Sequence, residues 1–288
     1  MKSLEEMLTG TSRTFAITIP YLPEPQRREI TLAYLLLRII DTLEDGSLWP
    51  VAGRARALGE MIEFLADPTY TEAVSLAIGW CDPPPCHITS YLELLGSFPE
   101  VVAEILELEP TSSTIICQHA RRIAVGMSQS LSRPPHDLTS LRQYCYFVAG
   151  IVGELLTELF LLRLHPTEEQ AARLRELAVA FGEGLQLVNI LKDADADSRE
   201  GRQYLPAEVD KREVFALARR DLEDAAEYTR LLQIMGAPTG IVLFTAIPTA
   251  FALATLNRVE QDGPGAKLSR SEVLEIRQKV ETLVQETA

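Results

Sequence analysis

The sequence of 288 residues has few cysteines and few basic residues. Four cysteines are too few for a disulfide scaffold at this length. The stretch "CDPPPCH" around Cys81, Cys86 and His87 lacks the further ligands of a zinc site, so reduced loop cysteines are favoured. The 27 Lys and Arg residues are outnumbered by 41 Asp and Glu residues, for a net charge of -14. This balance argues against nucleic acid as a partner, because phosphate backbones need clustered Lys and Arg.

Long apolar segments are also scarce. No run reaches the roughly 20 residues that span a bilayer. The longest candidate, residues 240–256, contains Pro248 and several small residues, which favours a buried helix. The N-terminal stretch "MKSLEEMLTG" has no apolar signal region. We therefore expect a cytoplasmic protein without a transmembrane anchor, one that can contact a membrane surface peripherally.

β-Branched alternation and long polar linkers are lacking too, whereas apolar residues recur at three- and four-residue spacing. The pattern predicts helices at about 25–45, 52–67, 69–80, 88–109 with a break near Pro99, 112–132, 138–164, 167–198, 207–235, 240–260 and 269–287. Thr167 with Gln170, and Ser269 with Glu272, have the spacing of capping boxes. We predict one all-α domain across residues 1–288, with buried central helices.

The helix predicted at 138–164 carries two glycines and two acidic residues in an apolar setting. Gly150 and Gly153 each cost about 1 kcal/mol against alanine in a helix, so they predict a kink, tight packing or clearance for an apolar chain. Glu154 and Glu158 lie one turn apart, and a solvated stripe is the favoured interpretation of this pair.

Three acidic side chains project from one otherwise aliphatic segment, "LLLRIIDTLEDG". At about 100° per residue, four further polar side chains of this helix fall within about 60° of Asp41. They are Tyr34, Arg38, Glu44 and Asp45. A solvated face does not explain the aliphatic surroundings, and an ion pair with Arg38 neutralises only one carboxylate. Because unpaired buried charge is costly, the surplus favours a bound cation.

A second acidic stretch, "LQLVNILKDADAD", repeats the pattern. Its polar face lies within about 40° of Asp193 and includes Gln186, Asn189 and Asp197. Asp195 falls on the opposite side, so we expect it to face solvent. Two buried Asp-x-x-x-Asp faces that meet would repel each other unless cations lie between them. Oxygen ligands without His or Cys favour Mg²⁺, with Mn²⁺ as a substitute.

A metal of this kind implies an anionic ligand. Mg²⁺ rarely fills its coordination shell with protein carboxylates alone and usually bridges to phosphate. We therefore predict a metal–diphosphate cluster at the two acidic faces, with Arg38, Lys192 and Arg202 as contacts for phosphate oxygens. Aliphatic walls, and small residues in "YCYFVAGIVG" and "IVLFTAIPTAFALATL", leave room for an apolar chain. An isoprenyl diphosphate fits, because its ionisation needs a metal-stabilised leaving group and a dry cavity.

Five stretches make residues 12–267 resemble the trans-isoprenyl head-to-head synthases of the squalene/phytoene synthase family. They are "SRTF", "YLLLRIIDTLED", "YCYFVAGIVG", "LQLVNILKDADAD" with "GRQYLP", and "FTAIPTAFALATL". The resemblance implies a helical bundle of the isoprenoid synthase type with a central apolar cavity. It also implies a prenyltransferase that condenses two farnesyl diphosphates to presqualene diphosphate, which carries a cyclopropane ring. In the branch that uses NADPH, a second ionisation, rearrangement and hydride delivery give squalene, which leads to sterols or hopanoids.

The resemblance further implies roles for single residues. Substrate contacts are expected from Ser12, Arg13, Phe15, Tyr34, Arg38, Gln186, Asn189, Lys192 and Arg202. Metal ligands are expected at Asp41, Glu44, Asp45, Asn189, Asp193 and Asp197. Catalytic roles are expected for Asp41, Asp45, Asp193, Asp197, Arg38 and Tyr144, the tyrosine assisting proton removal or diphosphate departure. NADPH contacts are expected from Thr14, Asn189, Phe244, Pro248 and Lys267.

NADPH rests on the resemblance alone. The stretch "FGEGLQ" lies within a predicted helix and follows no strand, so it is not a dinucleotide-binding motif. "DTLED" and "FTAIPTAFALATL" are similar to the NADPH-using branch, although "LSRS" after Lys267 is less basic than is usual there. The main alternative is the same scaffold stopping at presqualene diphosphate, dehydrosqualene or phytoene. A silent all-α binding protein is disfavoured because all four aspartates are present. A terpene cyclase is also disfavoured, because the second motif of such an enzyme normally mixes Asn, Ser or Thr with Glu.

Overall fold

The computed structural model describes residues 2–12, 14–199, 204–206 and 208–286, and within them it is 79% helical with no strand. The predicted all-α fold class is confirmed. The chain divides into two compact units, which we call unit 1 (Met1–Pro20 and Glu24–Arg133) and unit 2 (Tyr21–Pro23 and Pro134–Ala288). The predicted single domain and its central cavity stay predictions.

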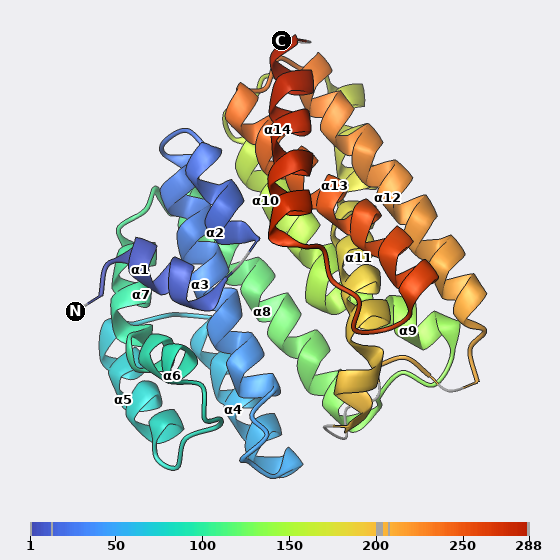
Figure 1. Cartoon of the computed structure of the whole chain (residues 1–288). Coiled ribbons are helices and arrows are strands. Elements are labelled where there is room, and N and C mark those ends of the chain that lie inside the picture. The colour runs from blue at the N-terminus through green and yellow to red at the C-terminus, as the bar shows by residue number, and fades with distance from the viewer. Residues whose placement is uncertain (1, 13, 200–203, 207, 287–288) are drawn as a thin grey trace. The chain divides into compact units, whose positions relative to one another are not determined.

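Unit 1 is built around a long apolar helix, α3 (Gln26–Glu44), which contacts most of the other helices of the unit (Figure 1). Its leucines and isoleucines, apart from the partly buried Leu37, are buried because they occupy the faces away from the polar stripe. Phe98 links two elements of this core, with its ring centroid 5.1 Å from that of Phe64 and 5.2 Å from that of Trp80. The other helices are α1 (Leu4–Thr11), α2 (Phe15–Thr18), α4 (Val51–Phe64), α5 (Tyr70–Cys81), α6 (Thr89–Gly96), α7 (Phe98–Leu106) and α8 (Pro110–Ser132).

Unit 2 is organised by the 32-residue helix α11 (Glu168–Arg199), which contacts most of the other helices of the unit (Figure 1). Two close backbone approaches pack it tightly. A Cβ at Gly153 would lie 1.8 Å from the Ala178 carbonyl oxygen, and one at Gly182 would lie 1.9 Å from that of Ala149. The tight packing predicted for Gly153 is confirmed. The other elements are α9 (Leu138–Cys145), the π-helix η2 (Tyr146–Gly150), α10 (Ile151–Leu161), α12 (Lys211–Ile234), α13 (Thr239–Asp262) and α14 (Arg270–Glu286).

Most predicted helices agree with the structure to within a few residues, including the break near Pro99, which lies in the first turn of α7. Both capping boxes form: the Gln170 amide donates to Thr167 Oγ1 at 3.2 Å, and that of Glu272 to Ser269 Oγ at 3.3 Å. The short helices α1 and α2 were not predicted, because they are too short to show a helical period. The helix predicted at 138–164 is interrupted by a turn of π-helix, which periodicity does not reveal.

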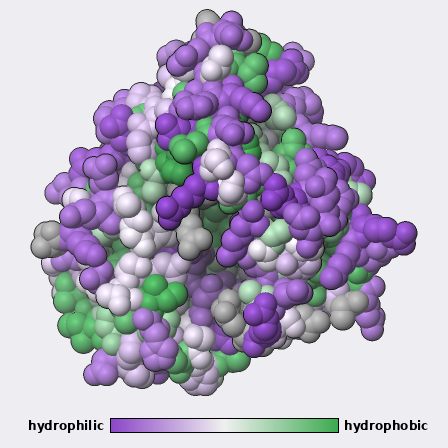
Figure 2. Space-filling view, in the orientation of Figure 1, coloured by the Kyte–Doolittle hydropathy of each residue, from purple (hydrophilic) through white to green (hydrophobic). Residues whose placement is uncertain are grey.

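Apolar helices bear on the membrane prediction. The stretches Leu138–Leu161 and Thr239–Asp262 are long and apolar enough to cross a bilayer by length and composition, but 56% of the most apolar window of each is buried in the structure. Buried core helices of globular proteins are often this long and apolar, and a buried helix is what the sequence predicts for residues 240–256. Hydrophilic side chains predominate on the face seen in Figure 2, with smaller hydrophobic groups among them. The absence of an anchor and the cytoplasmic location stay predictions.

Candidate active site

The first acidic motif is organised by Arg38 of α3, whose guanidinium lies between two aromatic rings. Its Cζ is 5.6 Å from the ring centroid of Tyr34 and 5.7 Å from that of Tyr91. Arg38 Nε donates to the Tyr34 hydroxyl at 3.3 Å, and Nη1 lies 3.3 Å from Asp41 Oδ2. Cation–π contact and the ion pair together fix the guanidinium beside the carboxylate, as the shared helix face predicts. No sequence signal pointed to Tyr91.

Asp41 is the most strongly perturbed carboxyl of this motif. Its side chain is only 34% exposed. Desolvation raises its pKa to about 6, although Arg38 lowers the pKa and Asp45 raises it. Asp45 caps the C-terminal end of α3 and is exposed, and its amide donates to the Asp41 carbonyl at 2.8 Å. Two acids one turn apart, one of them poorly solvated, are suited to a divalent cation that would hold both ionised.

Glu44 differs from its two acidic neighbours because it is only 6% exposed. Its backbone carbonyl accepts a hydrogen bond from Arg54 Nη1 at 3.0 Å, so a side chain of α4 caps the end of α3. Sequence analysis did not single out Arg54. The role of Glu44 as a metal ligand stays a prediction, and its burial sets it apart from the exposed Asp45.

Phe15, the last residue of the "SRTF" stretch, lies beside this motif within unit 1. The ring centroids of Phe15 and Tyr34 are 5.6 Å apart, and the Tyr34 hydroxyl donates to the Thr11 carbonyl at 2.7 Å. Ser12 Oγ accepts from the Phe15 amide at 3.0 Å. These contacts bring the start of α2 to the polar face of α3, where the substrate residues were predicted.

Two residues of "SRTF" were predicted to bind different ligands. The Thr14 carbonyl accepts from the amides of Ile17 and Thr18, at 3.0 and 3.2 Å, and its predicted NADPH contact stays a prediction. Arg13, a predicted phosphate contact, lies outside the described residues.

The second motif lies along α11 in unit 2 and is held by a lysine. Lys192 Nζ donates to Asn189 Oδ1 at 3.1 Å and lies 3.1 Å from Asp193 Oδ2. Asp193 is 43% exposed, and Gln186 and Asp197 are partly buried. Asp195 is exposed, as its place on the opposite side of the helix predicts. Each motif is described within its own unit, so the predicted shared metal–diphosphate cluster stays a prediction.

Tyr144 of α9 is buried and stacks on Tyr204, with ring centroids 4.9 Å apart and planes 19° apart. It belongs to an apolar cluster that includes Leu187 and Val188, which lie in the part of α11 that carries the second motif. Sequence analysis did not assign Tyr204, although it belongs to the "GRQYLP" stretch. Arg202 of that stretch lies outside the described residues.

The predicted NADPH residues of unit 2 fall into two groups. The Gly265 amide donates to the Lys192 carbonyl at 2.7 Å, which brings the segment before the exposed Lys267 to the second motif. By contrast, Phe244 is fully buried, in edge-to-face contact with Phe160 at 6.2 Å, and Pro248 is buried within α13. Lys267 is therefore available to a ligand, whereas Phe244 and Pro248 shape the helix core. Their cofactor roles stay predictions.

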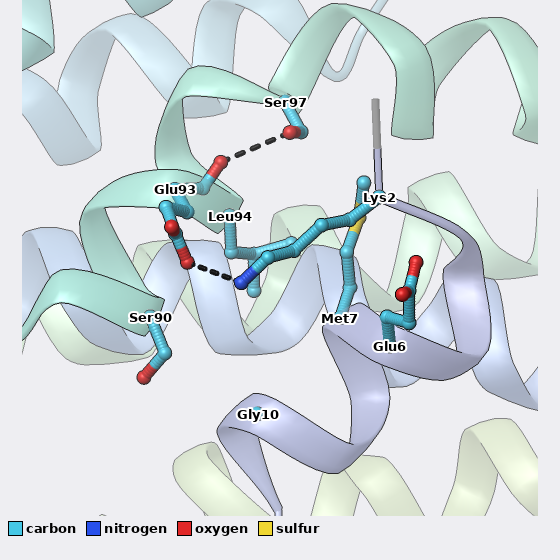
Figure 3. Close-up of a pocket in the computed structure, with 8 residues that line it drawn as sticks. All are labelled: Lys2, Glu6, Met7, Gly10, Ser90, Glu93, Leu94 and Ser97. Atoms are coloured by element: carbon cyan, nitrogen blue, oxygen red, sulfur yellow. Dashed lines mark hydrogen bonds and ion pairs between the residues drawn. The ribbon is translucent and has the colours of Figure 1, made fainter.

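Neither a metal cluster nor a surface pocket identifies the site independently. Among the described residues, no three His, Cys, Asp or Glu side chains form a group that could hold a metal ion. A pocket of about 310 Å³ in unit 1 lies between α1 and α6, spanned by the ion pair of Lys2 with Glu93 at 2.6 Å (Figure 3). It contains none of the predicted site residues. Its lining residues are Lys2, Glu6, Met7, Gly10, Ser90, Glu93, Leu94 and Ser97.

The comparisons with known proteins agree with the motifs. The model of the squalene/phytoene synthase family matches residues 8–215. The chain belongs to this family. It is 30% identical to human squalene synthase over 217 residues, which cover 75% of this chain and 49% of that protein. It is 28% identical to Botryococcus squalene synthase from Botryococcus braunii over 233 residues, which cover 80% of this chain and 47% of that protein. The chain thus spans about half the length of the curated relatives it matches.

A solved structure supports the fold. The squalene synthase TcSQS, in complex with the ligand E5700, aligns with a TM-score of 0.80 at 24% identity and covers 99% of this chain and 89% of that one. The isoprenoid synthase type of helical fold, implied by the resemblance, is confirmed.

Proposed function

We propose that this protein is an Mg²⁺-dependent prenyltransferase that condenses two farnesyl diphosphates head to head to presqualene diphosphate and reduces this product to squalene with NADPH. The observation that carries the proposal is the cation beside an aspartate in each acidic motif, Arg38 with Asp41 and Lys192 with Asp193. Such pairs place positive charge where diphosphate oxygens need it and carboxylates where a metal needs them. Membership of the family supports the same chemistry.

The donor set fits magnesium. Asp41 and Asp45 in the first motif, and Asp193 and Asp197 in the second, are hard oxygen ligands, and none of them is fully buried. When bound, Mg²⁺ stabilises the negative charge of the departing diphosphate. Arg38 and Lys192 would contact the phosphate oxygens and keep the aspartates oriented. The raised pKa of Asp41 fits this role, since a nearby cation restores the ionised form.

Tyr144 is proposed to assist proton removal or diphosphate departure. Its stacking on Tyr204 and its burial against α11 restrict the ring to one orientation. A fixed hydroxyl in an apolar setting is suited to a proton transfer from which water must be excluded.

The reductive step is proposed to use Lys267 as a phosphate contact for NADPH. The hydrogen bond from Gly265 to the Lys192 carbonyl supports this role, because it ties the lysine's segment to the helix that carries the second motif. Squalene is wholly apolar, so we propose that product release involves peripheral contact with a membrane.

The second candidate is a synthase that stops at presqualene diphosphate, dehydrosqualene or phytoene. The observation that favours it is the segment "LSRS" after Lys267, which supplies only one further basic residue for a cofactor phosphate. An enzyme of this kind would use the same acidic motifs and would need no NADPH.

One experiment tests both candidates. The purified protein is incubated with farnesyl diphosphate and Mg²⁺, with and without NADPH, and the lipid products are identified by mass spectrometry. We expect squalene only with NADPH, and presqualene diphosphate or dehydrosqualene-type products without it. Identical products in both reactions would reject the reductive step and support the second candidate. An EDTA-treated sample provides the control for metal dependence.

A further inference from the structure

Two buried carboxyl groups and an exposed arginine lie together in unit 2 where α9, α11 and α12 meet. Glu183 of α11 is only 3% exposed, and its Oε2 accepts from Arg142 Nη2 of α9 at 3.3 Å. Asp221 of α12 is only 4% exposed, and its Oδ2 has no hydrogen-bond partner in the part of the chain that the structure describes. The proposed reaction uses none of these three residues.

The close packing of the helices explains why these groups are enclosed. Glu183 lies between two glycines of the "FGEG" stretch. Gly182 admits the backbone of η2, while a Cβ at Gly184 would lie 3.2 Å from the Asp221 Cβ. Neighbouring backbones therefore reach α11 on both sides of Glu183, and little water can solvate the carboxyl groups.

The charges in this cluster do not balance if both carboxyls are ionised. Arg142 is the only cation bonded to them within the described residues, and it pairs with Glu183. An ionised Asp221 would leave a buried carboxylate oxygen without a donor, which is costly. A proton on Asp221 removes the unpaired buried negative charge, so the geometry favours the neutral acid.

The electrostatic surroundings agree with this assignment. Burial, together with the charge of Glu183, raises the pKa of Asp221 to about 7, against the lowering effect of Arg142. Asp224 and Arg220 on α12 act on it in opposite directions. On α9, burial raises the pKa of the Cys145 thiol, and the two acids add to this effect. Burial also raises the pKa of Glu183, against the effect of Arg142.

The cluster is adjacent to the tyrosine of the proposed site. Tyr144 lies two residues after Arg142 and belongs to the same apolar cluster as Leu187, which is one turn after Glu183. We propose that Arg142, Glu183 and a protonated Asp221 form a positioning cluster that holds the Tyr144 segment against α11, and that ionisation of Asp221 loosens this segment. The part that concerns Tyr144 rests on the proposed function, whereas the part that concerns protonation does not.

The first test measures stability against pH. Unfolded Asp221 ionises near its ordinary pKa, whereas the folded protein retains the proton up to about pH 7. The stability that this proton contributes is therefore present below pH 4 and is lost as the pH rises from about 4 to about 7. We expect Asp221→Asn to gain stability relative to wild type as the pH rises from 4 to 7, by several degrees in Tm, with Glu223→Gln, an exposed acid of α12, unchanged. A constant Tm difference between Asp221→Asn and wild type across this range would overturn the proposal.

The second test measures positioning through turnover of farnesyl diphosphate. We expect the wild-type kcat to fall as the pH rises above about 7, and Asp221→Asn to lack this fall. Glu183→Gln and Arg142→Gln should lower kcat roughly tenfold with little change in KM, and Arg142→Lys should restore part of it. A pH profile that is the same in wild type and Asp221→Asn would overturn the positioning role. Absence of turnover in wild type would instead reject the proposed function, while the stability test would still decide the protonation of Asp221.

Discussion

The two acidic motifs share one spacing but differ in their surroundings. In the first, Asp41 is crowded by protein beside an arginine held between two aromatic rings, and α3 ends one turn later. In the second, Asp193 is more exposed and lies beside a lysine, on a helix that continues to Arg199. The same Asp-x-x-x-Asp pattern therefore gives two leading aspartates with different surroundings: burial raises the pKa of Asp41 to about 6, while Asp193 is the more exposed of the two.

This difference has an electrostatic consequence. Negative charge at the C-terminal end of a helix is unfavourable, because the last carbonyls already carry partial negative charge. The first motif meets this cost with two arginines, Arg38 beside Asp41 and Arg54 on the last carbonyl of α3. In the second motif, Lys192 lies beside Asp193, and the side chain of Asp193 is more exposed than that of Asp41. We therefore expect the first motif to depend more strongly on its cations.

The largest expected effect comes from removing a predicted metal ligand. Asp41→Asn and Asp193→Asn should each lower kcat by about 100-fold or more, because a metal that stabilises a leaving group contributes several kcal/mol. Both variants should fold, since an amide is cheaper to bury than an unpaired carboxylate. Steady-state turnover of farnesyl diphosphate measures the loss.

Asp195→Asn is the matched control, because this residue is exposed on the opposite side of α11. It should retain nearly wild-type turnover. Loss of activity in Asp195→Asn with retention in Asp193→Asn would show that the assigned face of α11 is wrong.

Replacing the cation of each motif should lower kcat/KM by different amounts. Arg38→Met should lower kcat/KM about 10- to 100-fold, because it removes a bidentate-capable phosphate contact and leaves Asp41 unpaired. Lys192→Met should cost less, since the side chain of Asp193 is more exposed than that of Asp41. Arg56→Met, which removes a mostly exposed arginine of α4, is the control. An equal loss in the Arg38 and Lys192 variants would contradict the proposed difference between the motifs.

Ligand binding should stabilise the protein. The carboxylates of each motif repel one another in the free protein, so Mg²⁺ with inorganic diphosphate should raise Tm by several degrees, and EDTA should reverse the change. Differential scanning calorimetry provides the measurement. The increase should be reduced more in Asp41→Asn than in Asp193→Asn. A Tm that does not respond to Mg²⁺ and diphosphate would count heavily against a metal cluster.

The smallest expected effect concerns the reductive step. Lys267→Ala should shift the products toward presqualene diphosphate or dehydrosqualene-type compounds while consumption of farnesyl diphosphate continues, because misplaced NADPH delays hydride delivery. Product ratios from mass spectrometry measure the shift. Lys279→Ala, on α14, is the exposed control. An unchanged ratio in Lys267→Ala would remove this lysine from the cofactor site.

Phe244 requires a more conservative change. Its ring is fully buried against Phe160, so Phe244→Ala would cost about 3–5 kcal/mol of stability through a cavity. Phe244→Leu retains most of the volume and should shift the product ratio in the same direction without unfolding the protein. Loss of squalene only in proportion to lost folded protein would argue for a purely structural role.

Local geometry determined much of what could be predicted about this protein. Helical periodicity located the long helices, and the 100° step placed Arg38 beside Asp41 and Asp195 in solvent, because these relations involve residues within one helix. Residues three apart also predicted the cap at Thr167. Such contacts depend on the chain's own geometry and need no knowledge of its neighbours.

Only the tertiary structure decided the contacts that join distant segments. It placed Tyr91 on Arg38, joined Gly265 to Lys192, and buried Phe244 against Phe160. It also enclosed Asp221 beside Glu183, where two ordinary helical acids became poorly solvated. These relations depend on which helix faces pack together, and that choice reflects the burial of the whole core. One sequence therefore specifies which residues share a helix face, whereas packing sets how much water and charge surround them.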